Sequence, residues 1–542
     1  MNTRRVATGI AGAAGIIAVT TLFARIAGVG RIFVFADSVR ARGVGEVYQT
    51  VNALPNVLFE VAAGGILAAV AVPLIAHRLG AGEHDRADRI ASVLLTWALV
   101  VLVPAALVLY VTAPALSALM VDDFDPRAQV VGASLLRIFA IQVPLYGVGI
   151  ILTGLLQAHR RFLMAALAPL LSSLVVLCSY LWYGSLTGGQ TSPSAVSDSA
   201  LSVLGWGTTL GVVALSLPLV VPALRTGWRW RPSLRLPADD ARRIGSLAGA
   251  GVVALLAQQA AVLATVWLTN HSGDRGAFPV YQYVQAVYVL PYAVLAVPVA
   301  VSAFPALAAG TGAGHEVSAT LARALRGVLV LTGLAVGVLL AVAPTVGAFF
   351  QLLDARRGAD GASPVALSAM SGALMTYAPG LVGFGMAALL TRALYVRGRP
   401  MHAAAAVAGG WIVAMLPLAI VGPNQGPGAT LRALGLASTL GMTLTGLLLV
   451  VLVRREWGSE ATKGAARTTG VLVIAAAAAL AVGDVVTHGR ALDDFTEVLL
   501  TGVGAGLAAL CAGLVVLWVA DREMMTAVLL RGRARRRGGE TT

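Results

Sequence analysis

The stretch NALPNVLFEVAAGG, residues 52–65, places polar side chains in a run that is otherwise apolar enough to cross a membrane. Asn52, Asn56 and Glu60 follow one another at intervals of four residues, which puts them on one face of an α-helix. In a span over residues 47–76, Glu60 would lie roughly 18 Å below the outer end. An ionised carboxylate at that depth costs on the order of 3 kcal/mol when it faces lipid. The stripe is therefore expected to line a wet cavity; the alternative is a stripe that only holds helices together.

Further polar side chains in neighbouring apolar runs extend this expected cavity. Arg25 and Arg31 lie in the outer half of the run 8–35, and Arg25 is too deep to reach the interface easily. Two later runs contribute amide side chains: Gln258, Gln259 and Gln285. Guanidinium and amide donors together suit an anionic ligand such as a phosphate. We therefore expect a cationic, polar binding cavity between two halves of the protein.

The composition requires that these residues sit in a polytopic membrane protein. Of the 542 residues, 58% are hydrophobic and 12% are charged, and the mean hydropathy is +0.83. No soluble fold of this length buries that much apolar side chain. Runs of about 20 apolar residues are long enough to span the hydrocarbon core. The sequence predicts an all-α fold of fourteen spans, at about 8–35, 47–76, 90–114, 131–156, 163–183, 200–224, 246–269, 279–307, 324–350, 366–391, 402–421, 432–453, 468–488 and 496–519.

The basic residues predict the orientation of these spans. With the N-terminus inside, 28 of the 39 Lys and Arg residues fall in inner segments, eight fall in outer loops and three lie within spans. This asymmetry follows the positive-inside rule and predicts that both termini are cytoplasmic. The same distribution argues against nucleic acid as the partner of the +14 net charge, because the charges are spread over short loops.

Two pairs of motifs indicate an internal duplication. Leu-Pro occurs at Pro55 and again at Pro291, 236 residues later, and the segments 144–162 and 379–400 resemble each other at a similar offset. Spans 1–6 and 7–12 are therefore predicted to be parallel repeats. The expected organisation is an N-lobe over 1–224, a C-lobe over 225–453, two extra helices over 454–519 and a basic cytoplasmic tail over 520–542.

Neither enzyme chemistry nor metal binding is indicated. The chain has no HExxH, P-loop or GxSxG motif, and its two cysteines, Cys178 and Cys511, both lie in apolar runs. We expect no enzyme activity and no cofactor. A coupling ion or the membrane potential is left open as a source of energy.

The motifs ARIAGVGR (24–31), LPN (54–56) and VP (72–73) resemble the signature of the MurJ/MviN lipid II flippases, of the multidrug/oligosaccharidyl-lipid/polysaccharide exporter superfamily. The resemblance implies fourteen helices in a 6+6+2 plan and a place in the bacterial cell membrane. It further implies outward flipping of the undecaprenyl-pyrophosphate-linked peptidoglycan precursor by alternating access, and a lipid-tail groove formed by the last two helices. Arg25 and Arg31 match the family's two arginines of the first span. Glu46 matches its acidic residue at the start of the second, and we expect Glu46 to pair with Arg25 as part of an outer gate.

Two positions depart from this pattern. Phe59 and Ala286 stand where some members of the family have arginine, so the cavity is expected to be less cationic. Two other functions therefore stay open: export of another polyprenyl-linked glycan, and a transport-inactive scaffold that docks cell-wall synthesis proteins.

Overall fold

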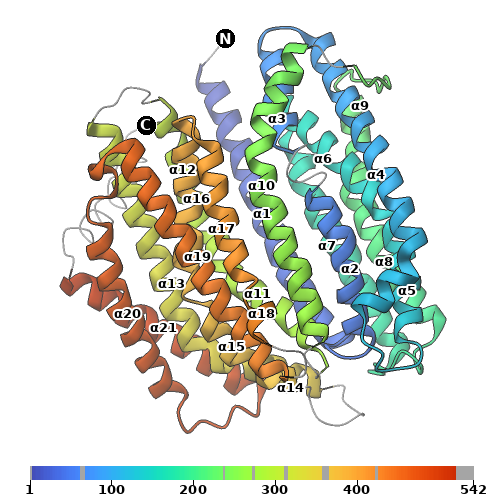
Figure 1. Cartoon of the computed structure of the whole chain (residues 1–542), viewed down its shortest axis with the longest axis vertical. Coiled ribbons are helices and arrows are strands. Elements are labelled where there is room, and N and C mark those ends of the chain that lie inside the picture. Colours follow the sequence, from blue (N-terminus) through green and yellow to red (C-terminus); the bar gives the residue numbers. More distant parts are fainter. Residues whose placement is uncertain are drawn as a thin grey trace. The chain divides into compact units, whose positions relative to one another are not determined.

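The computed structural model describes residues 3–61, 68–235, 238–271, 275–309, 315–356, 365–421 and 425–520. Every regular element in these ranges is helical, as predicted (Figure 1). The predicted basic tail from residue 521 onward lies outside the described residues. The chain forms two compact units, residues 1–280 with 353–364 and residues 281–352 with 365–542.

The first unit contains the elements that precede residue 280. They are α1 (Thr3–Ser38), α2 (Val44–Phe59), α3 (Ala68–Gly80), α4 (His84–Met120), α5 (Ala128–Ala140), α6 (Gln142–Ala158), α7 (Phe162–Thr187), α8 (Asp198–Ser216), the 3-10 turn η2 (Leu217–Leu219), α9 (Val220–Leu224) and α10 (Ala238–Asn270).

The second unit contains nearly all of the remaining helices. They are α11 (Ala277–Pro291), the π-helical turn η3 (Tyr292–Ala296), α12 (Val297–Ala309), α13 (His315–Ala355), α14 (Val365–Ser368), α15 (Met370–Tyr377), α16 (Gly380–Val396), α17 (Pro400–Ala414), α18 (Pro417–Ile420), α19 (Pro427–Trp457), the 3-10 turn η4 (Ser459–Thr462), α20 (Ala465–Thr487) and α21 (Phe495–Ala520).

Each of the fourteen predicted spans corresponds to one helix or to a run of consecutive helices. Eleven described segments are long and apolar enough to cross a membrane, and the bent pair α15–α16 makes a twelfth. The other two predicted spans correspond to α1 and to α2 with α3. The fold is therefore a polytopic bundle, and the count of fourteen is compatible with it.

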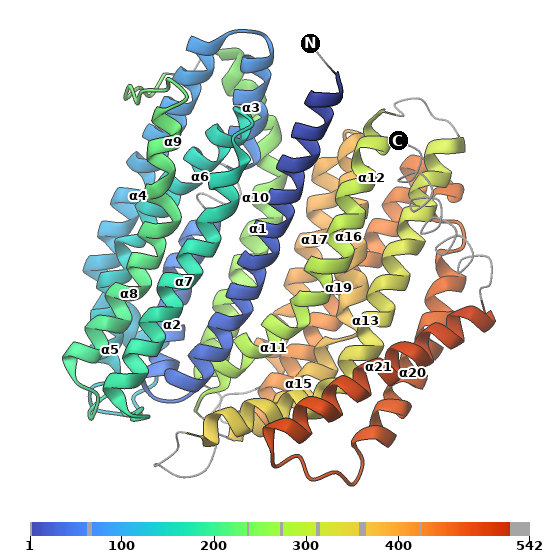
Figure 2. The same ribbon diagram turned by 180° about the vertical axis from the view of Figure 1, so that it is seen from behind.

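An aromatic cluster forms part of the core of the first unit. Tyr48 of α2 shares hydrogen bonds with the hydroxyl groups of Tyr180 of α7 and Thr208 of α8, at 2.8 and 2.9 Å. The rings of Phe35 and Phe139 pack against Tyr48 from α1 and α5. Each buried phenol thus satisfies its hydroxyl group while its ring supplies apolar area. This packing holds α1 beside α7, and α7 beside α8 (Figure 2).

Polar contacts fix two loops of the first unit. The Nε1–H of Trp228 donates to the Ser92 hydroxyl, at 3.2 Å, and ties the segment after α9 to α4. Asp125, in the loop before α5, accepts hydrogen bonds from the hydroxyl groups of Ser192 and Ser194. Burial opposes the ionisation of Asp125, but hydrogen bonds from Ser194, the Arg127 backbone and Ser192 lower its pKa to about 2.

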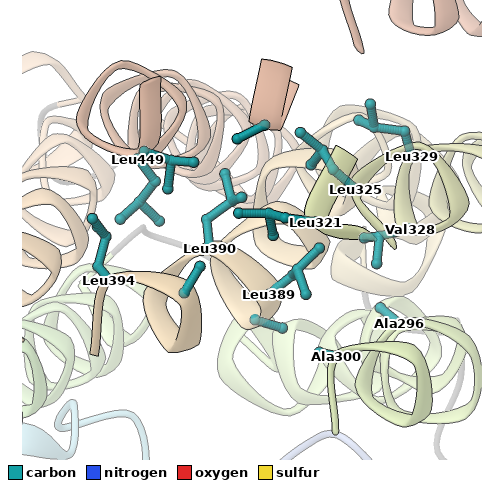
Figure 3. Close-up of a cluster of buried hydrophobic side chains, with 14 of the residues drawn as sticks. Ala296, Ala300, Leu321, Leu325, Val328, Leu329, Leu389, Leu390, Leu394 and Leu449 are labelled. Atoms are coloured by element: carbon teal, nitrogen blue, oxygen red, sulfur yellow. The ribbon is translucent and has the colours of Figure 1, made fainter. Parts of the chain in front are cut away.

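The core of the second unit is aliphatic. Leucine side chains from α13, α16 and α19 interdigitate, and small alanines of η3 and α12 let those helices approach them (Figure 3). Glycines let α13 and α20 pack closely: a Cβ added to Gly333 of α13 would clash with Leu472 of α20, and one added to Gly483 of α20 would clash with Ala341 of α13. Close approach at small residues is the usual way for helices to associate in lipid.

The aligned prolines share a local backbone feature. α2 contains Pro55 and passes into π-helical turns at Glu60 and Val61, and η3 follows Pro291 directly. A proline removes one hydrogen bond of the helix, and a π-turn is one way in which the following backbone adjusts. The predicted spans over 47–76 and 279–307 thus each contain a π-helical turn shortly after a proline.

The compact units divide the chain at a different place from the predicted lobes. α10, the seventh predicted span, packs on α2, α3 and α4 and belongs to the first unit. The C-terminal end of α13, from Leu353, also belongs to the first unit. The predicted lobe boundary at residue 225 marks where the second sequence repeat begins. It stays a prediction, because the compact units are defined by contacts and not by repetition.

Candidate functional site

The polar stripe of α2 lies on the less buried side of that helix. Asn52 and Asn56 are half-buried and Glu60 is exposed, whereas Val51 and Val57 on the other faces are buried. The α-helical geometry alone accounts for this segregation, because the polar residues recur at intervals of four.

Tyr146 of α6 contacts this stripe. Its hydroxyl donates to Oδ1 of Asn56 at 3.3 Å, and its ring lies 4.4 Å from that of Phe59. Arg31 of α1 lies within electrostatic range of Tyr146. One side of the first unit thus brings together a guanidinium, a phenol and an amide, all groups that can donate hydrogen bonds to an anion.

Arg25 is exposed on α1, and none of the described carboxylates pairs with it. The side chain is therefore available to a ligand or to water. It lies six residues before the half-buried Arg31, so the two guanidinium groups leave α1 in directions about 120° apart.

The three glutamines fall in different surroundings. On α10, Gln259 is buried and Gln258 is half-buried, and α10 packs on α2 within the first unit. Gln285 of α11 belongs to the second unit, where its Nε2 donates to the Tyr281 hydroxyl at 3.1 Å. The first unit therefore holds every predicted site residue except Gln285.

Gln285 lies in a cluster of tyrosines: Tyr281 and Tyr288 follow from the helical spacing in the sequence, whereas Tyr377 of α15 does not. Tyr377 of α15 hydrogen-bonds with Gln285, and its ring lies 5.7 Å from that of Tyr288. The Tyr288 hydroxyl is buried and has no hydrogen-bond partner among the described residues. This cluster offers apolar ring faces beside amide and phenol groups.

Glu46 is buried at the start of α2 and does not pair with Arg25 in this structure. It hydrogen-bonds with the backbone of Gly276, and Arg275 is the basic side chain that acts on it most strongly. Arg275 in turn lies over the ring of Phe124, with 4.9 Å between guanidinium and ring centroid. The expected partner Arg25 is thus replaced by a backbone contact and by Arg275, both from the segment that precedes α11.

The first unit also contains a buried ion pair that the sequence did not predict. Arg40 is 1% exposed and donates from Nε and Nη2 to the two carboxylate oxygens of Asp354, at 3.0 and 3.1 Å. Its Nη1 donates to the carbonyl of Gly189. Arg40 and Asp354 are 314 residues apart, and a single sequence carries no signal for a contact over such a separation.

These side chains are chemically suited to an anionic ligand. Arg25, Arg31, Tyr146 and Asn56 supply donors, and the described part of the chain holds no cluster of His, Cys, Asp or Glu suited to a metal. Nucleophile–base pairs of the kind that hydrolases use do not occur among these contacts.

Comparison with known proteins finds a family and several relatives for this chain. The family model for the lipid II flippase MurJ matches residues 36–492. A probable lipid II flippase MurJ of Synechocystis sp. is 27% identical over 225 residues, 40% of this chain and 40% of that protein. One of Rhizobium tropici is 28% identical over 336 residues, 58% of each chain. The chain thus aligns with about half the length of these relatives.

Solved structures with the same fold include a lipid II flippase MurJ in an inward closed conformation, with a TM-score of 0.71, 16% identity, and coverage of 94% of this chain and 99% of that one. An inward-facing multidrug resistance MATE family transporter has a TM-score of 0.60 at 13% identity, over 82% of this chain and 99% of that one. A transporter of the same superfamily from Pyrococcus furiosus has a TM-score of 0.58 at 13% identity, over 82% and 96%. At these identities the matches show a shared fold.

Proposed function

Because the chain belongs to the MurJ family of lipid II flippases, we propose that it moves lipid II, the undecaprenyl-pyrophosphate-linked peptidoglycan precursor, from the inner to the outer leaflet of the bacterial cell membrane by alternating access. The single observation that carries the proposal is the family match, which extends from residue 36 to residue 492. Members of this family are flippases, which are transporters and not enzymes.

The chemistry of the candidate site supports a pyrophosphate ligand. Arg25 and Arg31 precede the matched range, so their assignment depends on the motif ARIAGVGR and on their side chains. An exposed guanidinium in a membrane-spanning helix requires water or an anion nearby. In this proposal, Arg25 and Arg31 bind the pyrophosphate, and Asn52, Asn56 and Glu60 line the polar surface beside them.

The remaining predicted residues have supporting roles in this proposal. Gln258 and Gln259 add amide groups on α10, and Gln285 adds another on α11. Glu46 acts at the outer gate, where its contact with Gly276 opens when the gate opens. The groove for the lipid tail lies on α20 and α21, whose outward faces are rich in exposed leucine and valine side chains.

One observation favours a transport-inactive scaffold as the second candidate. Phe59 stands at a position where some relatives carry arginine, and its ring packs on Tyr146 at 4.4 Å. This contact replaces a cation with an aromatic surface, which weakens the attraction for pyrophosphate. A scaffold would dock cell-wall synthesis proteins and would not require a cationic cavity.

Expression in a strain depleted of its own lipid II flippase distinguishes these functions. Lipid II in the outer leaflet is measured with an externally added enzyme that cleaves it. We expect the wild-type chain to restore both growth and cleavage. A chain present at normal abundance that restores neither would contradict the flippase assignment. The exporter alternative then predicts that depletion in the native host retains a different lipid-linked glycan in the inner leaflet.

A further inference from the structure

A cleft between α5 and α8 belongs to the first unit and lies outside the candidate site. The two helices pack side by side (Figure 2), and the cleft between them has a volume of about 310 Å³. This volume is within the range of pockets that hold small ligands. Five of the nine lining residues are aliphatic, which makes the walls mainly apolar: Val130, Val131, Leu135 and Ile138 of α5 and Leu201 of α8. We call this feature the α5–α8 cleft.

The cleft is long and thin. On α5 its lining runs from Arg127 to Ile138, eleven residues or about 17 Å along the helix. A Cβ added to Gly205 of α8 would clash with Ile138, so the two helices touch at that level and close the cleft. A helix of about 10 Å diameter would need on the order of 1,000 Å³ over the same length. The cleft therefore fits an extended apolar chain and does not fit a helix.

An ion pair stands at the end of the cleft where both helices begin. Nη2 of Arg127 donates to Oδ1 of Asp198 at 2.6 Å, and the two side chains are 40% and 83% exposed. This contact uses one nitrogen of the guanidinium and one oxygen of the carboxylate. Further donors of Arg127 and the second oxygen of Asp198 are thus available to a ligand.

The ion pair lies at the level of lipid headgroups. α8 and the turns that follow it form a span over Asp198–Leu224, 27 residues or about 40 Å long. The hydrocarbon core is about 30 Å thick, and the bilayer with its headgroups is about 40–45 Å thick. Asp198 is the first residue of this span, so it and the bonded Arg127 lie beyond the core.

We propose that the α5–α8 cleft binds a phospholipid whose headgroup carries a primary ammonium group, as phosphatidylethanolamine does. The phosphate accepts hydrogen bonds from Arg127, the ammonium donates to Asp198, and one acyl chain lies along the aliphatic walls. A cation and a carboxylate side by side match a zwitterion better than they match an anionic or an uncharged headgroup.

The chemistry of the lining also favours a primary ammonium over a quaternary one. A primary ammonium has three N–H donors for a carboxylate, whereas the choline group of phosphatidylcholine has none. Proteins commonly hold quaternary ammonium groups among aromatic rings, and none of the described residues that line the cleft is aromatic.

The test measures lipid retention by the purified full chain in detergent. Phosphatidylethanolamine, phosphatidylcholine and phosphatidylglycerol with identical acyl chains are added in equal amounts, and native mass spectrometry counts the lipids of each class that stay bound. We expect one phosphatidylethanolamine molecule to be retained about tenfold more often than either of the others, because a hydrogen bond to a charged group is worth about this factor.

Variants of the protein locate the bound lipid. Asp198→Asn should abolish the preference for phosphatidylethanolamine, because the amide has no charge to pair with the ammonium. Arg127→Gln should lower the retention of all three lipids, and Ser202→Trp should prevent retention by filling the cleft.

The matched control is Asp123→Asn, which removes an exposed carboxylate of the same unit that does not line the cleft. It should leave the preference intact. These substitutions are at surface positions, and the unfolding temperature in detergent shows whether each variant is folded.

Four results would overturn the proposal. Equal retention of the three lipids by the wild type would show no recognition of the headgroup, and a preference for phosphatidylglycerol would show that only an anion is recognised. A preference for phosphatidylethanolamine that survives both Asp198→Asn and Ser202→Trp would place the lipid elsewhere on the protein. A dimer in the mass spectrum that Ser202→Trp removes would identify a second copy of the chain as the occupant. None of these measurements depends on transport activity.

Discussion

Arg25 is the residue on which the proposed pyrophosphate contact depends most directly. It is exposed and unpaired by any described carboxylate, so its removal should not cost a structural ion pair. We expect Arg25→Ala to abolish complementation of a flippase-depleted strain at near-normal membrane abundance. Arg25→Lys should retain partial function at most, because lysine keeps the charge but loses bidentate geometry. Full complementation by Arg25→Ala would exclude this arginine as the phosphate ligand.

Arg40 offers the opposite case, a cation whose role is structural. Its backbone adopts φ 73°, a left-handed conformation that costs an L-residue roughly 1–2 kcal/mol. The buried bidentate contact with Asp354 holds it there. We expect Arg40→Ala to destabilise the protein by about 3–5 kcal/mol, because the buried carboxylate of Asp354 loses its bidentate partner and keeps the more distant guanidinium of Arg42, at 4.0 Å. Thermal unfolding in detergent measures this.

Two controls separate the ion pair from the backbone effect. Arg40→Gly removes the same ion pair but relieves the left-handed strain, so it should be less damaging than Arg40→Ala. Asp198→Asn breaks the exposed pair with Arg127 and should change stability by less than about 1 kcal/mol. Equal unfolding temperatures for Arg40→Ala and the wild type would show that the buried pair contributes nothing.

At the scale of single residues, the sequence predicted which polar side chains share a helix face, but it did not predict which residues they contact. The face shared by Asn52, Asn56 and Glu60 follows from helical periodicity, and the structure has these residues on the less buried side. The contacts of Asn56 with Tyr146 and of Glu46 with Gly276 join segments that are distant in the chain. Such contacts depend on how the helices pack against one another, and a single sequence does not show this packing.

At the scale of elements, periodicity and length predicted the spans well and their interruptions poorly. The break between α5 and α6 at Ile141 lies three residues before Pro144, and the bend of 42° between α15 and α16 lies at Pro379; both lie within single predicted spans. The π-turns after Pro55 and Pro291 depend on how the following backbone recovers its hydrogen bonds. A local sequence feature such as a proline indicates where a helix can bend. The direction and size of the bend depend on tertiary packing.

The stripe of α2 makes a prediction for the whole helix. In a variant whose two native cysteines are replaced, single cysteines at Asn52 and Asn56 should react with a small water-soluble thiol reagent. Cysteines at Val51 and Val57, which face the bundle, should react at least about tenfold more slowly, because buried thiols are shielded from water.

Replacement of Cys178 and Cys511 is needed because both are exposed in the structure. A cysteine at Val485, an exposed residue of α20, serves as a control for a lipid-facing position. Reaction at equal rates around α2 would contradict a one-sided aqueous face and would favour a stripe that only joins helices.

At the scale of the whole molecule, the distribution of arginine predicts which side of the membrane each loop occupies. Both termini and the segment 225–235 are expected inside, and the loop before α8 is expected outside, because 28 basic residues lie on one side against eight on the other. Ala195, in that loop, and Arg229, after α9, are both exposed and suit cysteine labelling. In intact cells, a membrane-impermeant reagent should label Ala195→Cys but not Arg229→Cys. After permeabilisation both should be labelled, which shows that each thiol is accessible. Labelling of Arg229→Cys in intact cells would contradict this orientation, because the segment after α9 would then lie outside the cell.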